Sequence, residues 1–150
     1  MRRVIVLVTL AGVAVLPVAA LAASTGKTHH YTDHLVGALV QQHGKISVYA
    51  YRVTSSDVGP GASVSVDSAT GSKTGAIRAT SYFSNGSVRT AGSFRLGAGT
   101  ASGLVAVATS GKVTGGTGAF KGAHGTFRGT GTYNPKTNMT TLTVHGVITP

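Results

Sequence analysis

The chain reads TGGTGAFKGAHGTFRGTG from Thr114 to Gly131, and this stretch decides the fold. Glycines recur throughout it, and the aromatic rings of Phe120 and Phe127, with Tyr133 just beyond, are spaced between them. Glycine destabilises an ordinary strand, so within β structure it usually marks a bulge, a sharp bend or a close backbone approach. A sheet that curls back on itself needs such positions. The stretch therefore predicts strongly bent β structure.

A second β signal is Asn85-Gly86, the pair most typical of a two-residue type I′ turn, because both central positions of that turn need positive φ. A turn centred on this pair predicts that Phe83 faces Val88 across a hairpin. The apolar residues of both strands then share one face. The opposite face of this predicted hairpin carries Arg78, Tyr82, Arg89 and Arg95.

Other β-branched, alternating or short apolar runs predict strands at residues 46–53, 62–67, 103–109 and 139–148. The 103–109 run is continuously apolar, which is consistent with a strand buried on both sides or with a segment of buried helix, and its short length and flanking glycines favour the strand. Alternation places Val64 and Val66 on one face, taken as the inward face, and Asp67 on the other, so Asp67 is expected outside. Seven or eight short strands without an amphipathic helix predict an all-β protein with a single antiparallel closed β-barrel of about eight strands, because closure removes exposed edges.

The N-terminus has the order of a secretory signal peptide. Arg2 and Arg3 precede an apolar run over residues 4–18, and residues 20–22 form a small-x-small cleavage pattern. We expect a signal peptide over residues 1–22, cleavage before Ala23 and a secreted protein. An uncleaved membrane anchor is the alternative, since about 20 apolar residues span a bilayer. Residues 23–44 are predicted as a flexible lead-in with at most a short strand, which leaves residues 45–150 for the barrel.

The composition is basic and lacks cysteine. Removal of the two N-terminal arginines lowers the formal net charge from +10 to +8, and the carboxylates are Asp33, Asp57 and Asp67, with no glutamate. The basic residues are scattered singly, so no specific nucleic-acid partner is expected. Loose association with an anionic cell-surface polymer follows from the charge. An exported domain without disulfides is held by packing and backbone hydrogen bonds, as is common in bacterial extracellular proteins.

The run GGTGAFKGAHG at residues 115–125 resembles the signature hairpin of the allene oxide cyclase and dirigent family of small β-barrels. The resemblance covers roughly residues 62–148, in the family's order. It implies a barrel that often forms trimers, and either cyclisation of an unsaturated fatty-acid epoxide or orientation of phenoxy radicals. The cyclase reaction is assisted by a glutamate, which this chain lacks, so catalysis is not expected from it.

The leading functional hypothesis is binding of an apolar small molecule inside the barrel, without catalysis or a cofactor. The residues expected to line that interior are Ile77, Phe83, Val88, Phe94, Phe120 and Phe127. A structural or cell-surface-associated barrel with a filled core is one alternative, because eight-stranded barrels are often filled by side chains. A cyclase-like isomerase or a dirigent-type protein is the other. No catalytic residue is identified.

Metal binding has one weak set of candidates. His29, His30 and His34 lie close together in the sequence beside Asp33, and imidazoles can hold zinc or copper. The segment has no helical apolar stripe that would gather these rings on one face. It is therefore interpreted as a solvated segment, and no metal is expected.

Overall fold

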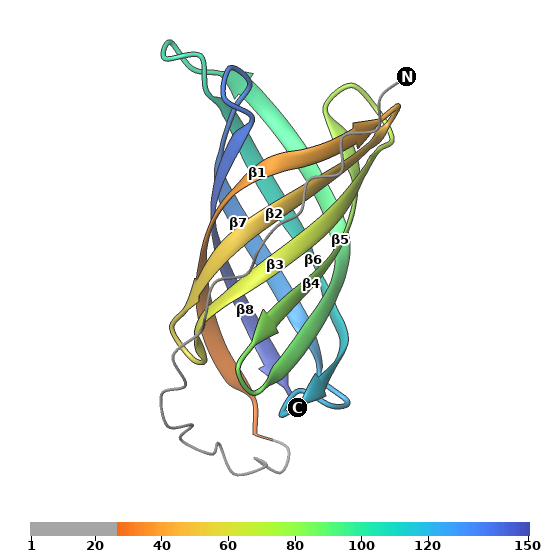
Figure 1. Cartoon of the computed structure of the whole chain (residues 1–150), viewed down its shortest axis with the longest axis vertical. Coiled ribbons are helices and arrows are strands. Elements are labelled where there is room, and N and C mark those ends of the chain that lie inside the picture. The colour runs from red at the N-terminus through yellow and green to blue at the C-terminus, as the bar shows by residue number, and fades with distance from the viewer. Residues whose placement is uncertain (1–26) are drawn as a thin grey trace, which may run out of the picture.

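The computed structural model describes residues 27–150 and is a single closed barrel of antiparallel strands (Figure 1). The strands, in chain order, are β1 (His29–His43), β2 (Ile46–Ser55), β3 (Gly59–Ala69), β4 (Thr74–Phe83), β5 (Gly86–Gly99), β6 (Val105–Gly118), β7 (His124–Asn134) and β8 (Met139–Thr149). Each strand pairs with its neighbour in the chain, and β1 pairs with β8 to close the sheet. The predicted all-β fold, a single antiparallel closed barrel of about eight strands, is confirmed.

The predicted signal peptide over residues 1–22 and the cleavage site before Ala23 lie outside the described residues. Within residues 27–150 there is no helix of the length and apolarity that a bilayer span requires.

The first strand corrects the prediction of a flexible lead-in up to residue 44. Residues 29–43 form β1, a full barrel strand paired on both sides, so the barrel begins at His29 rather than at residue 45. Tyr31, Asp33 and Leu35 point inward, and the residues between them point outward. Because the polar Asp33 is one of the inward residues, this segment shows no clear alternation of apolar and polar residues in the sequence. Pairing with β2 and β8 supplies the hydrogen bonds that stabilise this segment.

The hairpin of β4 and β5 turns one residue earlier than the sequence predicts. Its two-residue loop is Ser84 and Asn85, and Phe83 pairs with Gly86. Gly86 has a φ of 150°, and a side chain there would collide with the carbonyl oxygen of Thr117 on β6. Gly86 is therefore required because the neighbouring strand approaches it closely. The preference of Asn-Gly for a type I′ turn does not predict this contact.

The shifted turn changes the pairing of the hairpin but not its faces. Val88 pairs with Ser81 instead of Phe83, a slip of two residues. Because side chains alternate with a period of two, a slip of two residues leaves every side chain on its predicted face. The inward residues Ile77, Phe83, Val88 and Phe94 therefore remain inward, and Tyr82 and the three arginines of this hairpin are exposed.

The glycine-rich stretch forms the end of β6, a short loop and most of β7. A β-bulge interrupts the β5–β6 ladder, where Arg89 pairs with Gly115 and Thr90 pairs with Val113, which leaves Thr114 as the extra residue. At Gly116 an added Cβ would lie 2.7 Å from the Phe120 Cβ. The predicted bend is thus present, and it lets the loop fold back so that Phe120 enters the end of the barrel.

The predicted inward and outward faces of β3 are wrong. On β3 the exposed face carries Val64 and Val66, at 42% and 45% exposure, while Ser63 and Ser65 are buried and Asp67 lines the interior. The alternation was correct, but its phase is opposite to the one assumed. The apolar valines therefore lie on the outer surface, and the polar side chains of β3 point inward.

The apolar run at residues 103–109 was expected to be buried on both sides. In β6, Val107 and Thr109 are buried inside the barrel, whereas Ala106 and Ala108 are exposed on its outer surface. Alanine is apolar but small, so its exposure costs little, and the run is an ordinary strand with one buried face.

Two apolar clusters fill parts of the interior. The first, called the end cluster, combines Val113, Phe120, Ala123 and Ile148 with the half-buried Tyr31, Val58, Phe83 and Val88. It lies at the end of the barrel where the β6–β7 loop and the C-terminus are found, at the bottom of Figure 1. The second contains Tyr51, Val107 and Leu142 with five partly buried neighbours. The end cluster closes one end of the barrel with packed side chains.

Candidate functional site

The barrel encloses a cavity of about 270 Å³. A water molecule takes up roughly 30 Å³ in the liquid, and pockets for small ligands begin near 300 Å³. The interior is therefore larger than a site for isolated waters and close to the size of a small-ligand pocket. All eight strands contribute inward side chains to its lining, and the β6–β7 loop contributes Phe120.

All six residues that the sequence predicts for the interior line this cavity: Ile77, Phe83, Val88, Phe94, Phe120 and Phe127. The inward direction of the four residues on β4 and β5 follows from the alternation that the shifted hairpin turn preserves. Phe127 faces inward by the alternation of β7, and Phe120 enters the barrel from the β6–β7 loop. A ligand-binding role for them stays a prediction.

The cavity has two chemically different sides. The polar wall, on β2, β3 and β4, carries Ser47, Ser55, Ser63, Ser65, Asp67 and Ser81 beside the apolar Ala69, Ile77, Ala79 and Phe83. The apolar wall consists of side chains from β5 to β8: Val88, Phe94, Leu96, Val107, Phe127, Leu142, Val144 and Ile148. Threonines at three positions are interspersed along the apolar wall. A molecule that fits this cavity would therefore meet hydroxyl and carboxyl groups on one side and hydrocarbon on the other.

Asp67 is the most strongly perturbed acid of the cavity. Burial raises the pKa of its carboxyl group from 3.8 to about 6, since the charged form loses solvation. The neighbouring Ser65 hydroxyl offsets part of this rise. Neither the Asp67 Oδ1 nor the Ser65 Oγ makes a hydrogen bond of standard geometry, although both atoms are buried. The polar wall thus holds two buried oxygens without a hydrogen bond of standard geometry.

Asp33 is the second inward carboxyl group, and it lies on β1 opposite Ser55. Its pKa is also raised, chiefly by burial, while a hydrogen bond from Ser55 lowers it and the charge of Asp57 raises it further. The Asp33 Oδ1 is buried without a hydrogen-bond partner. Asp33 and Asp57 lie toward the end of the barrel where β2 turns into β3, whereas Asp67 lies near the opposite end of β3.

Tyr49 and Tyr51 stand beside Asp67 on the neighbouring strand. Their rings are stacked, with centroids 6.1 Å apart and an interplanar angle of 26°. Burial raises the pKa of Tyr49 to about 12, with smaller contributions from Tyr133 and Asp67, and burial also raises the pKa of Tyr51. Both phenols therefore stay protonated at neutral pH, where they are available as hydrogen-bond donors.

The histidines of β1 do not form a metal centre. His30 and His34 point to the outer surface four residues apart, a separation of roughly 13 Å along a strand, so they cannot share an ion. The His34 Nδ1 lies 3.2 Å from the Thr143 Oγ1, a hydrogen bond across the β1–β8 ladder. His29 is the first residue of β1. Among residues 27–150, no group of three or more potential ligands is placed to hold a metal ion.

Sequence reasoning missed the polar wall and both buried carboxyl groups. The signal was present as Ser63-Val-Ser-Val-Asp67, a strict alternation that places the serines and Asp67 on one face. It was interpreted with the valines inward, because apolar residues usually face the interior. In this barrel the lining of β3 is polar.

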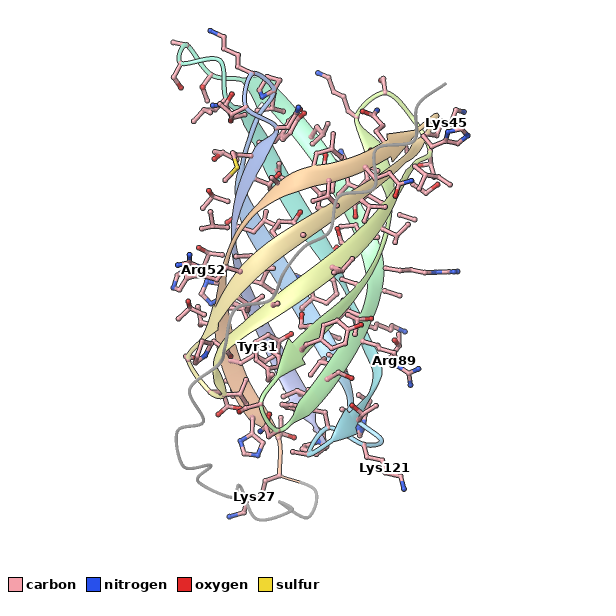
Figure 2. The ribbon with its side chains drawn as sticks, in the orientation of Figure 1. Lys27, Tyr31, Lys45, Arg52, Arg89 and Lys121 are labelled. Atoms are coloured by element: carbon pink, nitrogen blue, oxygen red, sulfur yellow. The ribbon has the colours of Figure 1, made fainter. Side chains whose placement is uncertain are left out.

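The charges of the described chain are separated radially. Asp33 and Asp67 are partly buried in the cavity lining, whereas Asp57 is exposed at its edge in the turn between β2 and β3, and Lys45 is the single basic residue of that lining. Every lysine and arginine of residues 27–150 is exposed. Figure 2 shows Arg52, Arg89 and Lys121 pointing away from the barrel. The outer surface is therefore cationic, and the interior is acidic.

Comparison with known proteins identified no relative: no family model, no curated protein and no solved structure matches this chain. The resemblance to allene oxide cyclases and dirigent proteins therefore stays a prediction, and functional inference rests on the cavity.

Proposed function

We propose that this protein binds an apolar small molecule inside its barrel and does not transform it. The cavity of about 270 Å³ carries this proposal, because a barrel with a filled core would leave no such space. The apolar wall offers a hydrocarbon surface that is interrupted by three threonines. The end cluster closes one end, so a bound molecule would be shielded from water there. Burial of apolar ligand surface against these side chains supplies the binding free energy.

A small neutral naphthalene dye, whose emission shifts in apolar surroundings, tests this proposal. We expect saturable binding to the wild-type protein and a loss of about tenfold or more in affinity for Val144→Phe, which fills part of the cavity. Val64→Phe is the matched control, because Val64 lies on the outer face with 42% exposure, and it should bind the dye like the wild type. Absence of dye binding, or equal binding by both variants, would contradict the proposal.

The position of Asp67 favours a second candidate, an intramolecular isomerase of the allene oxide cyclase type. A carboxyl group with a pKa of about 6 inside a cavity can exchange a proton near neutral pH, as general acid–base catalysis requires. An unsaturated fatty-acid epoxide would be converted by the wild-type protein and not by Asp67→Asn, while dye binding persists in both. If the wild-type protein gives no cyclic product, binding alone remains as the function.

The cationic outer surface supports loose association with an anionic cell-surface polymer. The strands present Arg52, Arg78, Arg89, Arg95, Lys112 and Arg128 to solvent, and the exposed carboxylate among residues 27–150 is Asp57, in the turn between β2 and β3. We expect the protein to co-sediment with polyphosphate-rich wall polymer at low salt. About 0.5 M salt should release it, because screening at that concentration shortens the electrostatic range to a few ångströms. Retention at high salt would argue against a purely electrostatic contact.

A further inference from the structure

The cavity contains buried polar oxygens that make no hydrogen bond of standard geometry. Ser65 is 4% exposed, and its Oγ points into the cavity without a hydrogen-bond partner. The Oδ1 atom of Asp67, two residues along the same face of β3, is also buried and unpaired. Buried acceptors are normally satisfied, and those that are not often mark a place that a ligand completes. These two atoms lie next to each other on the polar wall.

The surroundings of Asp67 suit a positive charge. Asp67 pairs with Ser47 on β2 and with Ile77 on β4, so its nearest cross-strand neighbours carry no charge. The stacked rings of Tyr49 and Tyr51 face the same cavity from β2, and both feel the Asp67 charge. Aromatic rings beside a carboxylate are a typical environment for an alkylammonium group, since the ring faces attract cations.

The charge balance of the lining disfavours a ligand with an anionic group. Three carboxyl groups line the cavity against one amine, that of Lys45, which is exposed at the end of the barrel where β1 turns into β2. The carboxylate of a fatty acid would therefore meet like charges at Asp67 and at Asp33. A purely hydrocarbon ligand would leave the acceptors of the polar wall unpaired, which costs binding free energy.

We propose that the ligand is an amphiphilic amine, whose ammonium group binds Asp67 and Ser65 while its hydrocarbon body lies against the apolar wall. This inference rests on the proposed binding function and adds the chemical class of the ligand. The cavity also limits its size: a volume of about 270 Å³ accommodates an amine with a short alkyl chain or a single small ring system.

Three molecules with the same eight-carbon chain test the proposal: octylammonium, octanol and octanoate, each titrated by calorimetry at about pH 7.5 in about 0.15 M salt. We expect octylammonium to bind about tenfold or more tightly than octanol, and octanoate to bind most weakly, because hydrogen bonds to a charged group are the stronger ones. Equal affinities for octylammonium and octanol would overturn the proposal.

Variants locate the ammonium group. Asp67→Asn keeps the shape of the side chain and should reduce octylammonium affinity about tenfold while octanol affinity is unchanged. Asp33→Asn is the matched control at the other end of the cavity and should have little effect. If Asp33→Asn removes the preference for the amine instead, the assignment to Asp67 is wrong. Should Asp67→Asn fail to fold by circular dichroism, the three ligands on the wild-type protein still decide the ligand class.

The outcomes also separate this inference from the proposed function. If octanol and the neutral dye bind but octylammonium has no advantage, apolar binding stands and the amine inference fails. If none of these molecules binds, the proposed function fails as well.

Discussion

Phe120→Ala is expected to lower the free energy of unfolding by about 3–5 kcal/mol, the usual cost of removing a buried phenyl ring. Phe120 is 7% exposed although it belongs to the β6–β7 loop, and its ring lies 6.0 Å from that of Phe83. It packs with Val113, Ala123 and Ile148 at the closed end of the barrel. Removing the ring would leave a void that this end cannot collapse to fill, because the strand ladders hold the surrounding backbone apart.

Chemical denaturation followed by circular dichroism measures this effect. Tyr82→Ala is the control, because Tyr82 is 55% exposed on the outer face of β4, and it should change the unfolding free energy by no more than about 0.5 kcal/mol. A loss of less than about 1 kcal/mol for Phe120→Ala would show that the loop does not close the barrel end.

The stability of the protein should rise as the pH falls from about 7.5 to about 4.5, by about 2 kcal/mol from Asp67 alone. Burial raises the folded-state pKa of Asp67 to about 6, above the ordinary value of 3.8, so the folded protein binds this proton more tightly than the unfolded chain. The penalty of the buried carboxylate is therefore fully present above about pH 6 and is relieved as the pH falls toward 3.8. Asp33 acts in the same direction, since its pKa is also raised.

Comparison with Asp67→Asn isolates this effect from other titrating groups of the same lining, including Tyr49, Tyr51 and Asp33. Between about pH 4.5 and about pH 7.5, the unfolding free energy of the wild type should fall by about 2 kcal/mol relative to that of the variant. A difference that is independent of pH would mean that Asp67 is solvated and does not face a dry cavity.

Much of the fold could be predicted because its signals are local. The alternation in β4 and β5, the turn near Asn85 and the bend at the glycine-rich stretch are each encoded within a few residues. The predicted turn was wrong by one residue, which shifts the pairing of β4 and β5 by two residues. A shift of two leaves each side chain on its predicted face of the sheet. The predicted lining residues of β4 and β5 point inward because the shifted ladder keeps their side chains on the predicted face.

The candidate site was harder to predict from the sequence than the fold. The strand β1 carries a charged residue, Asp33, in its inward series, so its pattern is weak by itself. Its place in the barrel depends on ladders with β2 and with β8, whose partners are far along the chain. The position of Gly86 similarly reflects a contact with β6 rather than the conformation of its own turn.

The sequence by itself determined that this chain forms short antiparallel strands that bend and close, because period-two alternation, turns and glycines act on neighbouring residues. Only the tertiary structure decided which face of β3 is enclosed. An alternating pattern has two equivalent phases, and on β3 the pattern of Ser65, Val66 and Asp67 is compatible with both. Closure of the barrel selects one phase for all strands together, and in doing so it places Asp67 inside the cavity and Val66 outside.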